Sequence, residues 1–348
     1  MQATKLLSAA SARQQYLALG HENSPYLSVY PWDPTTGFGT KFSNPSTLPG
    51  AKITGVSFSP SGYQIVAVED RSTNNVSAYA WTNAGFGTRY SAPSTPPAGN
   101  ATAVAFCPQT ESVAITHLSS PFISAYAWSS AGFGSKYSDP SSGVFNLDPY
   151  ALAFSPSGNA LIISGFSTIS TLYAYAWSSA GFGTKYTNSG GSGGKYGLKF
   201  SQSGNFIFVA SSSSTYGFAQ EWNSSTGFGT SYGVTVPLQG QASGVTSFMA
   251  GSSEFVAFST AFSLYHGFYN WAESTLTWGS RITSALVAMN AAANCTAVNK
   301  TGNSIAFGYS ASPYVSVVKW DSGVASRYSN PATLPTGTVS SVSFGEVG

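Results

Sequence analysis

The chain has few charged side chains. Its 348 residues include 14 Lys and Arg and 12 Asp and Glu, 7% of the sequence, whereas an ordinary globular domain has about 25%. A net charge of +2 argues against a nucleic-acid-binding protein, which normally carries a strongly basic domain. The two cysteines, Cys107 and Cys295, are too few for a disulfide scaffold or a structural zinc site, and we expect both to be reduced and buried.

Long hydrophobic runs are also missing. No uninterrupted apolar stretch approaches the roughly 18 residues of a membrane-spanning helix, so no membrane insertion is expected. The chain is nevertheless predicted to fold, because aromatic residues make up 15% of it and disordered chains lack them. Ser, Thr, Asn and Gly therefore replace charge as the solvent-facing residues.

What the sequence does contain is a repeat built around tryptophan. An alternating run such as NVSAYAW precedes each repeat Trp, and a glycine-rich turn such as GFGTKY follows five of them. FSPSG, at Phe58 and again at Phe154, lies 23 residues before a repeat Trp. Seven copies, 45 to 49 residues apart, are centred on Trp32, Trp81, Trp128, Trp177, Trp222, Trp271 and Trp320.

Each copy is predicted to form four short strands. In the second copy these are Thr54–Ser59, Tyr63–Glu69, Asn75–Trp81 and a run near residues 88–93. Period-2 alternation, β-branched and aromatic residues, and Gly/Pro punctuation favour strands over helices. Four strands per repeat of this length are typical of a β-propeller blade, whereas a β-solenoid has much shorter repeats.

The two chain ends complete one blade. Thr338–Gly345 matches the first strand of a blade, and Gln14–Gly20 matches the second. The sequence therefore predicts an all-β fold, a seven-bladed β-propeller of four-stranded antiparallel blades. Pairing of the C-terminal strand with the N-terminal strands closes the ring and removes an open sheet edge. Residues 14–348 are expected to be this single propeller, and residues 1–13 an N-terminal arm outside the repeats.

The FSPSG turn and the Trp that ends the third strand resemble the WD-repeat propeller. Trp32-Asp33 and Trp320-Asp321 keep its name-giving dipeptide. The combination of GFGTKYSNP-type and FSPSG segments, over roughly residues 14–345, is more specifically similar to a degenerate WD-like repeat of tailed-bacteriophage structural proteins. That resemblance implies a virion protein, a capsid decoration, tail or fibre-associated component. Its partners would be other virion proteins and a host-surface glycan, with multiple copies on a particle.

Residues that could carry catalysis are sparse. Glu69 and Asp70 are the nearest carboxylate pair, and neighbouring residues on a strand point to opposite faces. Thr277-Trp278 matches the end of a sialidase-type box but lacks its Asp, and no nucleophile elbow or phosphate loop occurs. The sequence therefore predicts no enzyme, no catalytic residues, no metal and no cofactor. The alternative is a lectin-like propeller, secreted or surface-bound, with one weak sugar site per blade.

One position per repeat varies while its neighbours are uniform. It lies eleven residues before the repeat Trp, at the end of the second strand, where the turns of one propeller face surround the pore. Divergence on a shared scaffold suggests a candidate binding rim, although drift at solvent-facing positions would look the same. The rim residues are His21, Asp70, His117, Phe166, Ser211, Thr260 and Tyr309.

A second repeated position is basic. It lies in the fourth, outermost strand, where Lys or Arg discourages edge-to-edge pairing; a cationic girdle for an acidic partner is the alternative. This outer basic ring consists of Lys41, Arg89, Lys136, Lys185, Arg281 and Arg327. The aromatic residues beside it, and the repeat Trp residues, are expected to pack between blades. The arm resembles a signal peptide with too short an apolar core, and either anchors a neighbouring protein or frays.

Overall fold

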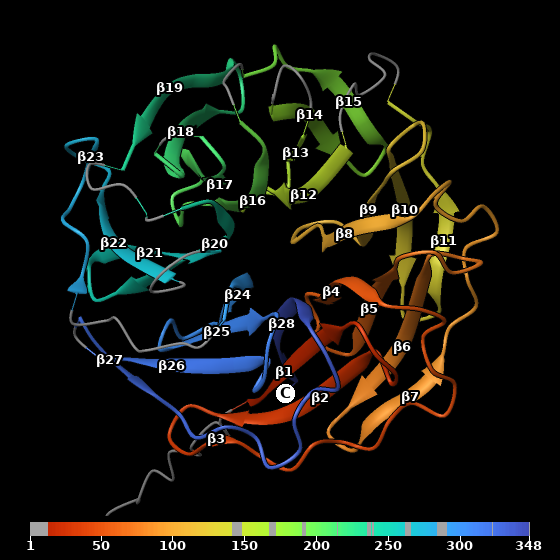
Figure 1. Ribbon diagram of the computed structural model, residues 1–348. Coiled ribbons are helices and arrows are strands. Elements are labelled where there is room, and N and C mark those ends of the chain that lie inside the picture. Colours follow the sequence, from red (N-terminus) through yellow and green to blue (C-terminus); the bar gives the residue numbers. More distant parts are fainter. Residues whose placement is uncertain are drawn as a thin grey trace, which may run out of the picture.

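The computed structural model describes residues 13–140, 148–166, 172–189, 193–213, 215–234, 238, 240–261, 266–283, 291–321 and 323–347. In these ranges, 28 strands form seven four-stranded antiparallel sheets around a central axis (Figure 1). The predicted all-β, seven-bladed propeller is therefore confirmed. Of the predicted arm, the structure describes Arg13. No helix in the described residues is long and apolar enough to cross a membrane.

The strands of the first four blades begin and end as follows. The first blade contains β28 (Val339–Val347), β1 (Gln14–His21), β2 (Leu27–Asp33) and β3 (Gly37–Phe38). The second contains β4 (Ile53–Phe58), β5 (Gln64–Glu69), β6 (Val76–Thr82) and β7 (Gly85–Arg89). The third contains β8 (Ala101–Phe106), β9 (Ser112–His117), β10 (Ile123–Ser129) and β11 (Gly132–Lys136). The fourth contains β12 (Asp148–Phe154), β13 (Ala160–Phe166), β14 (Leu172–Ser178) and β15 (Gly181–Lys185).

The last three blades repeat the same order. The fifth contains β16 (Lys195–Phe200), β17 (Phe206–Ser211), β18 (Gly217–Asn223) and β19 (Gly227–Gly233). The sixth contains β20 (Ala242–Ala250), β21 (Ser253–Thr260), β22 (His266–Ala272) and β23 (Thr277–Trp278). The seventh contains β24 (Ala293–Val298), β25 (Ser304–Tyr309), β26 (Val315–Asp321) and β27 (Val324–Arg327).

Both chain ends contribute to the first blade. β28 pairs antiparallel with β1 from Gln14, opposite Val347, to His21, opposite Val339. The ring is therefore closed as the sequence predicts, with one strand from the C-terminal end and three from the N-terminal end.

The hydrophobic core lies between blades. Each of the seven clusters of buried residues combines side chains of two adjacent blades, and the cluster between the seventh and first blades completes the circle. Every repeat Trp packs in the cluster that its blade shares with the preceding one, and all seven are at most 6% exposed. The prediction that these Trp residues form an interblade core is confirmed.

An aromatic ring from the outer part of one blade meets the Trp of the next. The ring of Phe42 lies 5.0 Å from that of Trp81, and the ring of Tyr137 lies 5.4 Å from that of Trp177, both edge-to-face. The first Gly of the GFG turn makes this approach possible. A Cβ on Gly132, whose φ is +96°, would lie 2.9 Å from the Tyr90 ring. Any larger residue there would meet both the ring and a left-handed backbone conformation.

The two faces of the ring differ in the turns they carry. The first strand of each blade begins, and the second ends, on one face, which we call the mouth face. The SxSG turns between first and second strands lie on the opposite face. In one of these turns the hydroxyl of Ser155 accepts hydrogen bonds from the amides of Asn159 and Ala160, so side chains satisfy backbone donors that the turn leaves unpaired.

Candidate functional site

A β-bulge interrupts the first strand of every blade at the same place. In the second blade, Ile53 lies opposite Glu69 and Gly55 opposite Val68, which leaves Thr54 as the extra residue. Bulges redirect a side chain relative to the regular alternation of a strand and often occur beside functional sites. The seven bulge residues are Thr54, Thr102, Tyr150, Tyr196, Ser243, Asn294 and Ser340.

Four of these side chains tie their blade to the next. The Thr54 hydroxyl donates to the carbonyl oxygen of Ala101 at 2.7 Å, and the Asn294 amide donates to that of Val339 at 3.1 Å. In the same way, Ser243 of the sixth blade donates to the Ala293 carbonyl of the seventh. Ser340 of the first blade donates to the Ile53 carbonyl of the second. In each case the acceptor is the residue just before the neighbouring bulge, so the four bonds repeat one geometry.

The third, fourth and fifth blades depart from this pattern. The Thr102 hydroxyl donates to Thr116 of its own blade at 2.9 Å. Tyr150 and Tyr196 instead place large rings at the bulge, with centroids 5.2 Å apart and planes inclined by 36°. Tyr150 is 39% exposed. The two neighbouring aromatic rings, one of them open to solvent, form an aromatic surface where the other blades have small polar groups.

All seven bulge residues line one cavity of about 520 Å³ at the mouth of the central channel. Of the described residues that line it, Lys52 alone is charged. The Lys52 ammonium lies 3.6 Å from the carboxylate of Asp70, which also lies 3.8 Å from the guanidinium of Arg71. The cavity therefore combines an aromatic surface, several hydroxyls and amides, and one cation held by a neighbouring carboxylate. We call this site the channel mouth.

A carboxylate influences the aromatic part of the channel mouth. The pKa of the Tyr150 phenol is raised by burial, and then by the negative charges of Asp148 and Tyr196. Asp148 begins β12, two residues before the bulge, and is exposed. The phenol is therefore a hydrogen-bond donor at neutral pH, and the Asp148 carboxylate acts on it electrostatically from the start of the same strand.

The structure places the predicted binding rim mostly inside the protein. His21, His117 and Ser211 are fully buried, and Thr260 and Tyr309 are each 2% exposed. Among the rim residues, Asp70 and Phe166 reach the surface, and Phe166 is 50% exposed. A ligand can therefore reach two of the seven side chains. Binding by that pair stays a prediction.

The predicted outer basic ring is bonded within its own blades. Lys41 donates to Asn44 and Arg327 to Asn330, both at 2.6 Å, and Lys136 forms an ion pair with Asp139 at 2.6 Å. The Arg89 guanidinium donates to Leu48 and Ser77. In the remaining two members, Arg281 donates to the His266 carbonyl and Lys185 lies over the Tyr173 ring. Whether the ring protects sheet edges or meets an acidic partner stays a prediction.

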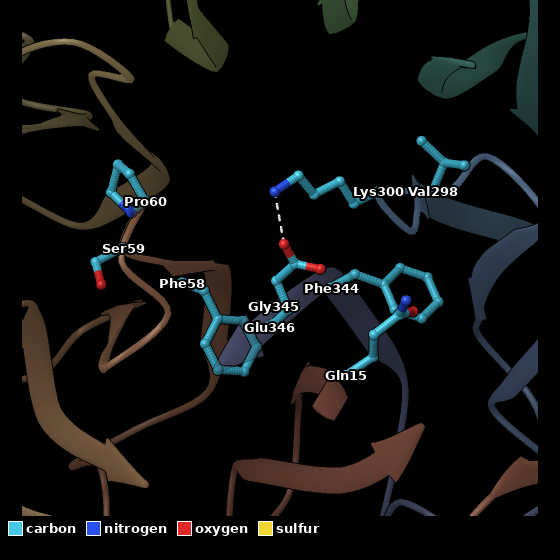
Figure 2. Close-up of a pocket in the computed structure, with 9 residues that line it drawn as sticks. All are labelled: Gln15, Phe58, Ser59, Pro60, Val298, Lys300, Phe344, Gly345 and Glu346. Carbon is cyan, nitrogen blue, oxygen red and sulfur yellow. Dashed lines mark hydrogen bonds and ion pairs between the residues drawn. The ribbon is translucent and has the colours of Figure 1, made fainter. Parts of the chain in front are cut away.

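A second hollow, of about 330 Å³, lies on the opposite face beside the closing blade (Figure 2). The Lys300 ammonium reaches across it to the Glu346 carboxylate at 2.6 Å, and Arg13 lies 3.5 Å from the same carboxylate. Its charged groups thus satisfy one another, and its other labelled side chains, such as Phe58 and Phe344, are mainly apolar (Figure 2). We therefore favour the channel mouth as the candidate site.

Sequence reasoning did not find the bulge residues, although a signal for them exists. Aligning the seven first strands gives the segments ITGV, ATAV, PYAL, KYGL, ASGV, ANCT and VSSV, in which the second position is always polar or Tyr. Tyr occurs there in two adjacent blades. Within the described residues, no group of three or more His, Cys, Asp or Glu side chains converges as a metal site would.

Comparisons with known proteins extend the description of the fold. No family model and no curated protein matches the chain. Among solved structures, a proposed 6-phosphogluconolactonase from Bacteroides uniformis matches 96% of this chain and 100% of its own, with 14% identity and a TM-score of 0.74. A proposed 6-phosphogluconolactonase from Bacteroides fragilis matches 97% of this chain and 99% of its own, with 13% identity and a TM-score of 0.72. The periplasmic gluconolactonase of Pseudomonas aeruginosa matches 96% of this chain and 100% of its own, with 11% identity and a TM-score of 0.69.

These matches contradict two predictions made from the sequence, that of a non-enzymatic tailed-phage structural or lectin-like protein and that of no enzyme. The matched propellers carry lactonase descriptions, and none of the three is described as a phage protein. The repeat motif did not indicate the function, because SxSG turns and interblade Trp residues stabilise the blade whatever site the fold carries. At 11–14% identity the likeness itself shows a shared seven-bladed propeller fold.

Proposed function

We propose that this protein is a lactonase-type hydrolase whose substrate binds at the channel mouth. The observation that carries the proposal is the pair of adjacent tyrosines, Tyr150 and Tyr196, at the entrance of a cavity that also holds Lys52. The descriptions of the matched propellers support the reaction class. Ligand sites of this kind combine a largely apolar surface with a few convergent polar groups.

Lactone hydrolysis adds water to an ester within a ring. The water oxygen attacks the carbonyl carbon, the bond from that carbon to the ring oxygen breaks, and the ring oxygen takes up a proton. The reaction needs a base near the water and positive charge near the carbonyl oxygen. In our proposal Asp148 accepts the proton from water, Lys52 stabilises the oxyanion, and the tyrosine rings hold the substrate ring.

The first prediction concerns this reaction. The protein should hydrolyse γ- and δ-lactones of sugar acids faster than the spontaneous rate, measured by proton release in weakly buffered solution. Asp148→Asn and Lys52→Met should each lower kcat about 100-fold or more, because each removes a group that acts in the transition state. Tyr196→Ala should mainly raise KM, by about tenfold, because the ring contributes to binding.

Tyr63→Ala provides a matched control. Tyr63 is 45% exposed and follows an SxSG turn on the opposite face, so its removal should leave both kcat and KM unchanged. The proposal is wrong if no lactone of the panel reacts faster than in buffer alone. It is also wrong if the Asp148 and Lys52 variants keep wild-type rates.

A further inference from the structure

The channel mouth offers hydrogen-bonding groups suited to an uncharged ring. The cavity that Tyr150 and Tyr196 line is also lined by the neutral residues Thr102, Asn294 and Ser340. Two carbonyls precede the fourth and sixth bulges, those of Pro149 and Ala242. The bulge side chains of the preceding blades are directed elsewhere, because Thr102 bonds Thr116 and the Tyr196 ring packs beside Tyr150. These carbonyls are acceptors that hydroxyl groups of a ligand can use.

Of the described residues that line the channel mouth, Lys52 alone is charged, and the proposed reaction assigns it to the oxyanion, which leaves no second lining cation for a phosphate. Lys52 is paired with Asp70, and the Arg71 side chain, 82% exposed, points into solvent. Lys195, next to Tyr196, is 3% exposed; its ammonium donates to the Gly193 carbonyl at 2.9 Å and lies 5.6 Å from the centre of the Phe218 ring. Asp148 adds negative charge beside Tyr150.

His21 and His117 add no charge either. Burial lowers the pKa of His21 and of His117 to about 4, so both are neutral at pH 7. Each bonds a serine of its own blade, Ser28 and Ser124 respectively, at 3.0 Å. The outer basic ring lies on the outermost strands, or just after them at Lys41 and Arg281, and its members have the partners described above.

The sequence adds no charged side chain in six further internal segments. Residues 141–147, 167–171, 190–192, 235–237, 262–265 and 284–290 contain no Lys, Arg, His, Asp or Glu. A phosphate monoester carries a charge of about −1.5 to −2 at pH 7 and is bound by Arg forks, Lys or helix N-termini. The described residues contain no α-helix.

We infer that the substrate is an uncharged, polyhydroxylated lactone rather than a phosphorylated one: its ring lies on Tyr150 and Tyr196, and its hydroxyls bond the bulge side chains and the neighbouring carbonyls. This inference rests on the proposed function and narrows it. The two neighbour descriptions, gluconolactonase and 6-phosphogluconolactonase, differ in this phosphate.

The test, and our second prediction, compares glucono-δ-lactone with its 6-phosphate under identical conditions. We expect kcat/KM to be at least tenfold higher for the uncharged lactone, and inorganic phosphate at millimolar concentration not to inhibit. Thr102→Arg, which adds a guanidinium at the channel mouth, should shift the ratio of the two kcat/KM values toward the phosphorylated lactone by about tenfold. Equal values, or a preference for the phosphorylated lactone, would overturn the inference and leave the lactonase proposal intact.

A protein inactive on both lactones would contradict the proposed function, and the inference would then be judged by binding. Titration calorimetry with 1,5-anhydroglucitol and its 6-phosphate, two unreactive rings, measures the same choice without turnover. Tighter binding of the uncharged ring, lost in Tyr150→Ala and Tyr196→Ala but not in Tyr63→Ala, would support the inference. Absence of binding, or tighter binding of the phosphate, would refute it.

Discussion

At the scale of single residues, buried polar groups define the mouth face. His21 and His117 end the second strands of the first and third blades, are fully buried, and each bond a serine hydroxyl on the adjacent strand. Burial disfavours the imidazolium, because taking the charge out of water costs free energy that the serine hydroxyl does not return. Both residues therefore make the folded protein sensitive to acid.

The third prediction follows from the direction of those pKa shifts. Each histidine has a pKa of about 4 when folded and about 6.5 when unfolded. Below pH 6.5 the unfolded chain takes up protons that the folded chain does not, so the free energy of unfolding falls between pH 6.5 and 4. The loss per histidine should approach 2–3 kcal/mol at pH 4.

Urea unfolding at several values between pH 4 and pH 7 measures this loss. His117→Gln should flatten the dependence of unfolding free energy on pH, because glutamine does not titrate. Its stability at pH 7 should be lower than that of the wild type, since the ring no longer fills its site. An unchanged dependence on pH in the variant would show that His117 is not the titrating group.

At the scale of elements, the seven first strands share one bulge but use it for two purposes. In four blades the bulge side chain bonds the carbonyl of the next blade, as Thr54 does to Ala101. In the fourth and fifth blades, Tyr150 and Tyr196 give up that bond and line the channel mouth. Equivalent positions therefore hold the ring together on one side and form the candidate site on the other.

The fourth prediction separates these purposes. Thr54→Val keeps the shape but removes the hydroxyl, so the Ala101 carbonyl loses its donor. The free energy of unfolding should fall by about 1–2 kcal/mol, with lactone hydrolysis changed little in kcat. Thr102→Val is the matched variant, because the Thr102 hydroxyl bonds Thr116 within its own blade. It should leave the interface between blades intact, and a larger loss in Thr102→Val than in Thr54→Val would contradict the assignment.

The sequence predicts the strands but not the bulges, because strands depend on local residue patterns and bulges on the pairing of two strands. Alternation, β-branched residues and turn residues are local, and they locate the blades because each blade needs them. A bulge depends on the register between two strands, as when Tyr150 is left over between Pro149 and Ala151, and no single strand encodes that register. Most rim residues, such as His21, are buried in the structure, and the variation of a position along the sequence does not reveal its burial.

At the scale of the whole molecule, stability depends on closing the ring. β28 places Val339, Val342 and Phe344 in the cluster between the seventh and first blades. Val347 joins the next cluster, between the first and second. Without β28, β1 would present a free strand edge and two interblade clusters would be incomplete.

The fifth prediction removes this strand. A chain that ends at residue 338 should unfold at a markedly lower urea concentration, and it should associate, because the β1 edge can pair with another chain. A circular permutant is the control, since Gln14 and Val347 are paired and a short linker can join the ends. With new termini at the exposed Ala98, between β7 and β8, it should keep near-wild-type stability. A truncated chain that stays monomeric and equally stable would show that β28 is dispensable.

The bulge residues that bond the next blade and those that line the channel mouth as aromatic rings are different positions, and this affects which substitutions the fold can accept. The repeat Trp residues and their aromatic partners are not bulge residues, and four of the seven bulge side chains bond the carbonyl of the next blade. Substitutions at Thr102, Tyr150 and Tyr196 therefore alter the shape and polarity of the channel mouth without touching either set of contacts. For the proposed site, a library limited to these three codons is therefore the experiment that would select new ligand specificities on an unchanged framework.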